Sequence, residues 1–378
     1  MVMLYYIGYY TCDLIRKEKR MVAPAAENKM GYVINALAEA MDEPFVVVTP
    51  AQTGLRRFFA GNSLELKTNV SLKTFPTFSS KIKLLRGLGH VLTRCSFLWY
   101  LMKNIKREDH LLVYHSLAYM NVIRWIQKIK KCKLTIEVEE LYSDVTCDAQ
   151  QREKEIAYLQ TADSYLFITE LLRREIDTQK QSVLSHGTYQ ALPNYGCRFD
   201  DGRIHVVYAG TFCKVKGGAY AAIAAAEYLD ERYTLEVLGG GSKEENAAVQ
   251  DLIREVSAKT KCKIKYAGYK TGKDFDSYIQ ACHIGLSTQQ PDGKYNATSF
   301  PSKILMYMSN GLRVVSVRIP AIETSAVGER VYYYDSQDPK EIARVIRSVA
   351  LDDGYDSRTH LEVLHKGFVE ELRKLLNG

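Results

Sequence analysis

The chain has 378 residues, of which 46% are hydrophobic and 25% are charged. One hydrophobic core rarely organises so long a chain, so the length predicts two domains of roughly 150–200 residues each. This composition is that of a folded protein rather than a disordered one, and no stretch approaches the roughly 20 apolar residues that span a bilayer. The first residues, MVMLYYIGYYTCD, lack the features of a signal peptide. Together with eight scattered cysteines that form no CxxC pair, this predicts a cytoplasmic protein with reduced thiols.

The net formal charge of +7 is unevenly distributed along the chain. From Ala51 to Lys133, 16 Lys and Arg stand against 3 Asp and Glu, whereas from Leu134 to Gln190 the numbers are 5 and 11. The basic segment carries no helix-turn-helix, RNA-recognition or zinc-finger pattern, so nucleic acid is not an expected partner. Aromatic residues lie among the charges, notably in FLWYLM (97–102), a mixture that favours an anionic membrane surface. The alternative is a solvated charged face with Trp99 in the core.

In the first half, short apolar runs rich in β-branched and aromatic residues alternate with amphipathic stretches, the pattern of a parallel sheet with crossover helices. We therefore expect a Rossmann-like domain over residues 1–190. The segment ALPNYGCRFDDGR (191–203) has no apolar period and is the expected linker. Strands are predicted at MLYYIGYY, FVVVT, LLVYHS, LTIEVEE, YLFIT and SVLSHG, and helices at GYVINALAEAM, MNVIRWIQKIKK and LLRREI.

The second half repeats this alternation, which predicts a second Rossmann-like domain over residues 204–352. Residues 353–378 are expected to form a closing helix that could pack back on the first domain. The predicted fold class is α/β, with the parallel sheets of two domains facing each other across a cleft. Ligands of such sheets bind beyond the carboxyl ends of the strands, where the motifs described next are found. Strands are predicted at IHVVYAG, TLEVLGGG, IKYAGY, IGLST and RVVSV, and helices at 218–229, VQDLIREVSAK, FDSYIQAC and KILMYMSN.

The segment VVYAGTFCKVKGG (206–218) carries the strongest local signal. Gly210 permits a sharp exit from a buried strand, and Lys216 precedes two glycines, Gly217 and Gly218, that open a helix. A lysine beside the free N–H groups of a helix N-terminus can hold a diphosphate. The alternative is an ordinary strand–turn–helix with a solvated lysine.

A second segment, STQQPDGKYNATSFPSKILMYMSNGLRVVS (287–316), also reads as strand, loop, helix and strand. Thr298, Ser299 and Ser302 offer hydroxyls where the helix begins, and Lys303 lies just inside it. Such a helix start could hold further phosphate oxygens, and the alternative is simply a capped helix. Asn310-Gly311 predicts where the helix ends.

Together the two segments resemble the nucleotide-binding half of retaining GT-B glycosyltransferases of family four, the glycosyl transferases group 1. The resemblance continues through LEVLGGG, IKYAGY, SYIQACHIGLST and RIPAIETSAVGERVYYYD, and covers nearly all of residues 204–345. In the first half, NKMGYVINALAEA is similar to the family's first glycine-containing helix and VYHSLAYMNV to its histidine loop. YLFITELLRREI and VLSHGTY resemble its serine-capped helix and the exit from its first domain, and all these pieces follow in the family's order.

This resemblance implies transfer of a sugar from a nucleotide-sugar donor to a lipid-linked or other saccharide acceptor, with retention of configuration. It implies no metal and no cofactor, and it places the enzyme in the cytoplasm, where it could lie peripherally on the membrane. His115 and Lys216 are the implied catalytic residues, and Gly31 and Glu139 lie on the acceptor side. The implied donor contacts are Gly210, Thr211, Lys216, Gly217, Gly239, Tyr269, Thr298, Ser299, Phe300, Pro301, Ser302 and Lys303.

The chain departs from the family pattern at three positions. Thr211 stands where the family usually has arginine, and Thr298 and Met306 stand where it has the two glutamates of its E-x7-E segment. Met306 cannot bind the ribose hydroxyls. SFPSK resembles the S-x-P-S-K of a family subgroup, which makes this loop a variant. The alternative is a catalytically idle GT-B subunit that stabilises a partner glycosyltransferase. A nucleotide-sugar epimerase would need acid and base residues for which no convincing set is evident.

Three further positions carry alternatives. His115 ends a predicted strand, where it could contact the donor sugar or serve a structural role. Strand alternation puts Glu137 and Glu139 on one face and Glu140 on the other, either as acceptor-orienting groups or as solvated charges. Asp274-Phe275-Asp276 spells a DxD sequence, but it lies at an expected helix N-cap, so no metal site is predicted there.

Overall fold

The computed structural model describes residues 2–143, 149–214, 217–291, 296, 298–351 and 354–377, the side chains of residues 14 and 24 excepted. The chain divides into two compact units, the first comprising residues 1–188 and 366–378 and the second residues 189–365. Each unit has one sheet, and all pairings between neighbouring strands are parallel except one. Among the described helices, none is both long enough and apolar enough to cross a membrane.

The sheet of the first unit has eight strands in the order β3-β4-β2-β1-β5-β6-β7-β8. β3 runs antiparallel to β4 at one edge, and every other pair is parallel. The central strands are buried on both faces, which explains why they read as continuous apolar runs in the sequence. The strands are β1 (Leu4–Ile7), β2 (Phe45–Thr49), β3 (Ser63–Lys67), β4 (Val70–Thr74), β5 (His110–Tyr114), β6 (Lys133–Val138), β7 (Ser164–Phe167) and β8 (Ser182–Leu184).

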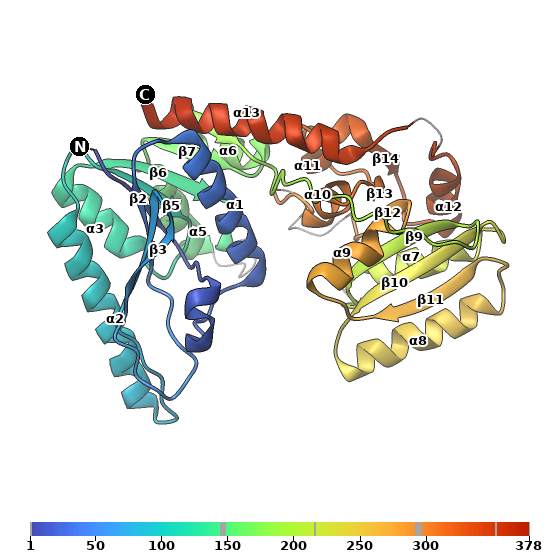
Figure 1. Cartoon of the computed structure of the whole chain (residues 1–378), viewed down its shortest axis with the longest axis horizontal. Helices are drawn as coiled ribbons and strands as arrows, with labels where there is room; N and C mark the ends of the chain where they lie inside the picture. Colours follow the sequence, from blue (N-terminus) through green and yellow to red (C-terminus); the bar gives the residue numbers. More distant parts are fainter. Residues whose placement is uncertain are drawn as a thin grey trace. The chain divides into compact units, whose positions relative to one another are not determined.

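Helices cover both faces of this sheet. In Figure 1, α2 and α3 lie together on one face and α1 lies on the other. The last residues of α13 also belong to this unit, where Phe368 stacks on Tyr32 of α1 with the ring centroids 5.5 Å apart. The helices are α1 (Pro24–Ala40), α2 (Lys83–Asn104), α3 (Met120–Lys130), α5 (Ala149–Leu159), α6 (Glu170–Ile176) and α13 (Ser357–Asn377).

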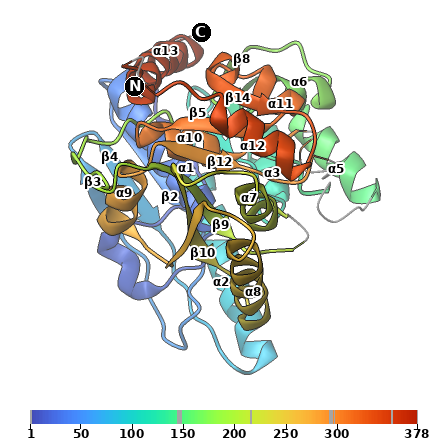
Figure 2. The same ribbon diagram turned by 90° about the vertical axis from the view of Figure 1, so that its right-hand side faces the viewer.

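The second unit has a six-stranded, all-parallel sheet in the order β11-β10-β9-β12-β13-β14. In Figure 2, α7 and α8 lie on one face and α9 and α10 on the other. The strands are β9 (Ile204–Thr211), β10 (Tyr233–Gly240), β11 (Lys263–Gly268), β12 (Ile284–Ser287), β13 (Arg313–Val317) and β14 (Val331–Tyr334). The helices are α7 (Gly218–Ala226), α8 (Lys243–Ser257), α9 (Gly272–Gln280), α10 (Ser302–Ser309), α11 (Pro320–Glu323) and α12 (Pro339–Arg347).

The alternation of strands and helices predicted from the sequence is confirmed, and the differences have physical reasons. The hairpin β3–β4 was not predicted because β3 is an exposed edge strand without an apolar run. α2 was not predicted because apolar residues occupy both its buried and its exposed faces. The predicted linker residues lie against the second unit, since the Leu192 amide donates to Ser309 O and the Tyr195 amide to Gln280 Oε1.

Candidate functional site

Two paired glycines, Gly210 and Gly239, lie at the carboxyl ends of β9 and β10. Gly239 has a φ of +125°, and a Cβ there would lie 1.8 Å from the carbonyl oxygen of Gly210, its partner across the ladder. No other residue type fits this position without moving one of the two strands. The pair forms a narrow floor at the strand ends of the second sheet, where parallel sheets bind their ligands.

Lys303 lies directly over this floor. A Cβ on Gly210 would be 2.5 Å from Lys303 Nζ, so the glycine leaves the room that the ammonium group occupies. Lys303 Nζ donates to the Tyr208 hydroxyl at 3.0 Å and lies 4.2 Å from the centre of the Tyr208 ring. The hydroxyl in turn donates to Thr211 O at 2.9 Å. A tyrosine of β9 thus holds the lysine of α10 beside the backbone at the end of β9.

The start of α7 completes this part of the second unit. Gly217 caps the helix with a φ of +66°, and a Cβ on Gly218 would lie 2.9 Å from the Tyr208 hydroxyl. Gln290 closes the other side, because its amide nitrogen would lie 2.6 Å from a Cβ on Gly217. Thr288 Oγ1 fixes the turn by donating to Gly218 O at 2.7 Å. The start of α7 and the Lys303 ammonium therefore both lie beside the Tyr208 side chain.

The remaining residues predicted on the donor side differ in exposure. Thr211 and Ser302 are exposed and Ser299 is half-buried. Tyr269, just beyond β11, is 79% exposed. Lys216 lies outside the described residues, so its predicted role as a diphosphate clamp and catalytic residue stays a prediction. Thr298, Phe300 and Pro301 are buried, and Met306 is half-buried on α10.

In the first unit, the carboxyl end of β6 carries a buried charge cluster. Lys29 of α1 is 5% exposed, and its Nζ lies 3.5 Å from Glu139 Oε1. The same nitrogen donates to Ser185 O and Ser185 Oγ at 2.9 Å and to Gly187 O at 3.0 Å. Tyr6 of β1 donates its hydroxyl proton to Glu137 Oε2. Glu139, predicted on the acceptor side, is therefore fixed by a lysine rather than solvated.

Burial raises the pKa of both carboxyl groups in this cluster. Burial and then the negative charge of Glu139 raise the pKa of Glu137 to about 8. Burial also raises the pKa of Glu139, and the Lys29 ammonium opposes that rise. The lysine lies beside Glu139, so Glu139 is the more readily ionised of the two. Strand alternation correctly placed Glu137 and Glu139 on one face.

His115 follows β5 but its imidazole points inward. The residue is 1% exposed, and Nε2 lies 2.7 Å from Glu155 Oε1. Although burial favours the neutral acid, hydrogen bonds from His115 and Ser143 hold the pKa of Glu155 below its usual value. Glu155 also accepts from the Tyr142 amide, and Tyr142 donates its hydroxyl to His115 O. These contacts make His115 a support for Tyr142, and its predicted contact with the donor sugar stays a prediction.

An apolar hollow of about 500 Å³ opens at the carboxyl ends of β1 and β5. Its walls come from the end of β1, the start of α1 and the segment after β5, and they include Tyr9, Tyr114 and Tyr142. None of the described residues that line it is charged. Aromatic faces with hydroxyl tips suit a sugar ring or another amphipathic group.

Gly31 and Asp274 are two further positions for which the sequence made a prediction. Gly31 is half-buried on α1, and a Cβ there would make an ordinary contact with the Tyr10 ring at 3.5 Å. Asp274 was expected at a helix N-cap, which is wrong, because α9 is capped at Thr271 and Asp274 lies in its first turn. Across the described residues, no cluster of three or more His, Cys, Asp or Glu suited to a metal was found.

Sequence reasoning missed the residues that support the site. Tyr208 was missed, because it lies 95 positions from the predicted Lys303 and nothing in either segment links the two. Lys29 had a weak signal, a lysine on the otherwise apolar face of an amphipathic helix, just before Gly31. Thr288 and Gln290 lie within the segment STQQ that the sequence did single out, but only their contacts with Gly217 and Gly218 give them a purpose.

Comparisons with known proteins bear on the family and the fold. Residues 203–352 match the family model described as glycosyl transferases group 1. A comparison with curated protein sequences finds no significant match.

Several solved structures match nearly the whole chain. The sucrose-phosphate synthase from Thermosynechococcus elongatus has a TM-score of 0.66 at 15% identity, covering 100% of this chain and 98% of that one. A trehalose-6-phosphate protein from E. coli, bound with UDP-2-fluoro glucose, has a TM-score of 0.61 at 10% identity, with coverages of 99% and 98%. A UDP-forming trehalose-phosphate synthase from Burkholderia xenovorans, in complex with glucose-6-phosphate, has a TM-score of 0.59 at 11% identity, with coverages of 99% and 96%.

At these identities the solved structures establish only the fold. The family model covers the part of the chain that contains Lys303, Gly210 and Gly239. The fold is GT-B, as the sequence predicted, and residues 203–352 are similar to the glycosyl transferases group 1 family.

Proposed function

We propose that the protein transfers a sugar from a nucleotide-sugar donor to a lipid-linked or other saccharide acceptor, with retention of configuration and without a metal ion. The observation that carries this proposal is the Lys303 ammonium held over Gly210 by Tyr208. A cation fixed beside a strand end and two helix starts is suited to a diphosphate.

In this proposal the donor diphosphate lies between Lys303, the start of α7 and Lys216. Negative charge on the departing nucleotide diphosphate grows in the transition state, and fixed positive groups stabilise it there more than in the ground state. The exposed ring of Tyr269 is free of the core and would stack on the nucleobase. Thr211, where related sequences have arginine, leaves the two lysines to carry the charge.

The acceptor would occupy the apolar hollow of the first unit. The hollow's three tyrosines could stack on a saccharide ring, and its apolar lining favours an acceptor with a hydrocarbon part over a freely charged one. Glu139, held by Lys29 at the same edge of the sheet, would orient an acceptor hydroxyl.

A lipid-linked acceptor also fits the exposed face of α2. Leu84, Leu88, Val91 and Trp99 recur at three- and four-residue spacing, or a multiple of it, and each is more than half exposed. Trp99 is 62% exposed, so the alternative that placed it in the core is wrong. Basic residues flank this stripe, and each cation near an anionic surface contributes about 1 kcal/mol of attraction. We propose that this stripe docks peripherally on anionic lipid; the flanking cations are Lys81, Lys83, Arg86, Arg94 and Lys103.

The donor is tested by a thermal-shift screen of nucleoside diphosphates and nucleotide sugars. Uridine diphosphate and UDP-glucose come first, because the E. coli structural neighbour binds a UDP sugar. A ligand at about 100 times its Kd should stabilise the protein by about 2.7 kcal/mol. Lys216→Ala should abolish detectable binding and leave the fold intact. Binding of ligand without any release of nucleotide from a nucleotide sugar would favour the idle-subunit alternative.

Metal independence is tested by chelation. We expect full sugar transfer in excess EDTA, since lysines and helix N-termini are proposed to meet the diphosphate charge. An absolute requirement for magnesium or manganese would overturn this part of the proposal and return attention to Asp274 and Asp276.

Membrane docking is tested by co-sedimentation with vesicles. Binding should require anionic lipid, weaken as salt rises from low to physiological concentration, and fall when Arg86, Arg94, Lys103, Lys106 and Arg107 are neutralised. Equal retention by neutral and anionic vesicles, or by neither, would point to an acceptor free in solution.

A further inference from the structure

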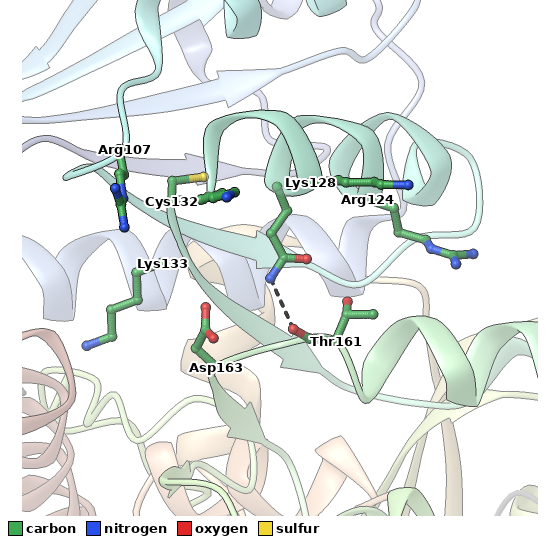
Figure 3. A pocket seen from close by; sticks show the side chains of 9 residues that line it. Arg107, Arg124, Lys128, Cys132, Lys133, Thr161 and Asp163 are labelled. Atoms are coloured by element: carbon green, nitrogen blue, oxygen red, sulfur yellow. Dashed lines mark hydrogen bonds between the residues drawn. The ribbon is translucent and has the colours of Figure 1, made fainter.

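A second hollow, of about 690 Å³, opens at the amino ends of the strands of the first sheet, whereas the apolar hollow lies at their carboxyl ends. Its volume is in the range of about 300–1,000 Å³ that small-molecule sites usually have. Figure 3 shows it from close by, with Arg107 and Lys133 on one side and Arg124 and Lys128 on the other. We refer to it as the basic hollow.

The basic hollow lies at the amino ends of three neighbouring strands. Arg107 precedes β5, Lys133 opens β6 and Asp163 immediately precedes β7. β6 has six residues, so at about 3.3 Å per residue its two ends are roughly 17 Å apart. Glu139 and the apolar hollow lie beyond the carboxyl ends. A ligand in the basic hollow would therefore occupy a site separate from the proposed acceptor.

The charge of the hollow is strongly one-sided. Five cations line it, Arg107, Arg124, Lys128, Lys131 and Lys133, against one carboxylate, Asp163. Asp163 Oδ2 already accepts from the Leu134 amide at 2.8 Å, so its carboxylate is engaged with the sheet. No ion pair joins any of the five cations to a described carboxylate, whereas several exposed cations elsewhere in the chain have one.

The walls of the hollow are held by the fold. Gln127 donates its side-chain amide to Thr161 O at 3.0 Å, which ties α3 to the turn before β7 (Figure 3). Lys133 is tied at both ends, its amide to Asp109 O at 3.2 Å and its Nζ to Leu375 O at 3.3 Å. Burial and then the charge of Lys133 lower the pKa of the neighbouring His110 to about 4, which is the sign expected for a positive local potential.

An ordinary reason for cations at this place exists but accounts for only part of the set. Cations are favoured at a helix C-terminus, and Lys128 and Lys131 lie at the end of α3. Arg124 lies farther back in α3, and Arg107 and Lys133 belong to other segments. Lys131 also adopts a left-handed φ of +53°, a conformation that a glycine or asparagine would take at less cost.

We propose that the basic hollow binds a phosphate-bearing anion, either the headgroup of an acidic phospholipid or a phosphate ester free in solution. Convergent guanidinium and ammonium groups suit phosphate oxygens, and an anion would relieve the repulsion among the five cations. The lipid source has support from Trp125 and Ile129, which are 48% and 45% exposed on α3 and adjoin Arg124 and Lys128 in sequence.

The first experiment measures the binding of inorganic pyrophosphate to the full chain by isothermal titration calorimetry. The variant is Arg124→Gln/Lys128→Gln/Lys131→Gln, and the matched control, Lys243→Gln/Lys261→Gln/Lys263→Gln, removes three exposed charges from the second unit. We expect the first variant to weaken one class of pyrophosphate sites at least tenfold and the control to leave it unchanged. Lys303→Ala should also leave this class unchanged, which separates it from the proposed donor site.

The second experiment uses phosphatidylcholine vesicles with and without phosphatidic acid. If the basic hollow takes a lipid headgroup, the triple variant will show a weaker preference for phosphatidic acid than the control, because only the α2 stripe remains to bind anionic lipid. If it takes a free phosphate ester, only the calorimetric binding will fall. The proposal is overturned if the wild type binds neither probe, or if the triple variant binds both as the control does. Thermal unfolding of each variant verifies that its fold is retained.

Discussion

The carboxyl ends of the two sheets differ in the groups that they offer to a ligand. In the second unit the floor is backbone, with Gly210 and Gly239 in contact and one lysine held above them. In the first unit the same edge carries a buried lysine, two glutamates and an apolar hollow lined by tyrosines. The glycines and lysine of the second unit suit a phosphate group. The cluster and hollow of the first unit suit a ligand with hydroxyls and apolar surface.

The difference explains why the two halves of the sequence were unequally informative. Backbone amides and glycines impose strict local requirements, and a strand–glycine–helix segment satisfies them in a recognisable order. This is the part that the family model matches, residues 203–352. A cluster such as Lys29, Glu137 and Glu139 depends on side chains from separate elements, so it leaves no continuous motif.

The largest expected effect comes from the buried charges of the first unit. Lys29→Met removes the cation beside Glu139, and breaking a buried ion pair in this way costs about 3–5 kcal/mol. Both tryptophans, Trp99 and Trp125, lie in the first unit, so tryptophan fluorescence during urea unfolding reports this unit alone.

Two controls accompany this measurement. The exposed Lys67→Met should change the unfolding free energy of the first unit by less than about 0.5 kcal/mol. Lys29→Met/Glu139→Gln should recover part of the loss, because the unpaired carboxylate is gone. If Lys29→Met is as stable as wild type, the cluster does not hold the end of β6.

The next effect is on donor binding in the second unit. Lys303→Ala should weaken the binding of the nucleoside diphosphate found by the thermal-shift screen by about 10- to 100-fold, because a hydrogen bond to a charged group contributes about 1.5–3 kcal/mol. Lys261→Ala, an exposed lysine of the same unit, is the control. Equal Kd values for wild type and Lys303→Ala would remove the lysine from the donor site.

Lys303 and Lys29 illustrate how much of the site could be predicted from the sequence. The segment 287–316 singled out Lys303 because it opens a helix after a strand, and local order was sufficient for that. Its partner Tyr208 could not be predicted, because it lies in a buried strand and the sequence does not distinguish it from an ordinary core residue. Lys29 was hidden in the same way, because its partners Ser185 and Glu139 are brought to it only by the folding of the sheet.

The basic segment shows the same limit from another side. Its charge count correctly marked residues 51–133 as unusual, but a count does not distinguish the stripe on α2 from the basic hollow at the amino ends of β5 to β7. That division depends on which face of α2 is buried. Phe97 and Leu101 pack inward whereas Leu88 and Trp99 face out, and all four are apolar. Apolar periodicity therefore could not choose between the faces.

A third effect is the pH dependence of the first unit's stability. Glu137 has a folded-state pKa of about 8, above the ordinary value near 4.5, so the folded state holds a proton that the unfolded state releases. Its contribution to stability is full below about pH 4.5 and is lost as the pH rises to 8. Glu137→Gln keeps a neutral side chain, so its stability relative to wild type should increase across this window by at most about 1.4 kcal/mol per pH unit.

The same fluorescence-detected urea unfolding, repeated between pH 5 and 9, measures this slope. Glu65→Gln, on the exposed edge strand β3, is the control and should show no comparable slope. A stability difference between Glu137→Gln and wild type that stays constant with pH would mean that Glu137 is ionised throughout.

The smallest effect separates stability from transfer at Gly31. A Cβ here meets the Tyr10 ring at 3.5 Å, an ordinary contact, and glycine inside a helix costs about 0.5–1 kcal/mol relative to alanine. Gly31→Ala should therefore stabilise the first unit by about that amount. If the acceptor approaches α1 closely at this point, as the resemblance to glycosyltransferases implies, the added methyl group should lower acceptor-dependent nucleotide release while leaving donor affinity unchanged. Gly367→Ala in α13, where a Cβ meets nothing within 4 Å, is the matched control and should add stability with no change in transfer. A Gly31→Ala variant that is both more stable and fully active would show that the glycine does not line the acceptor site.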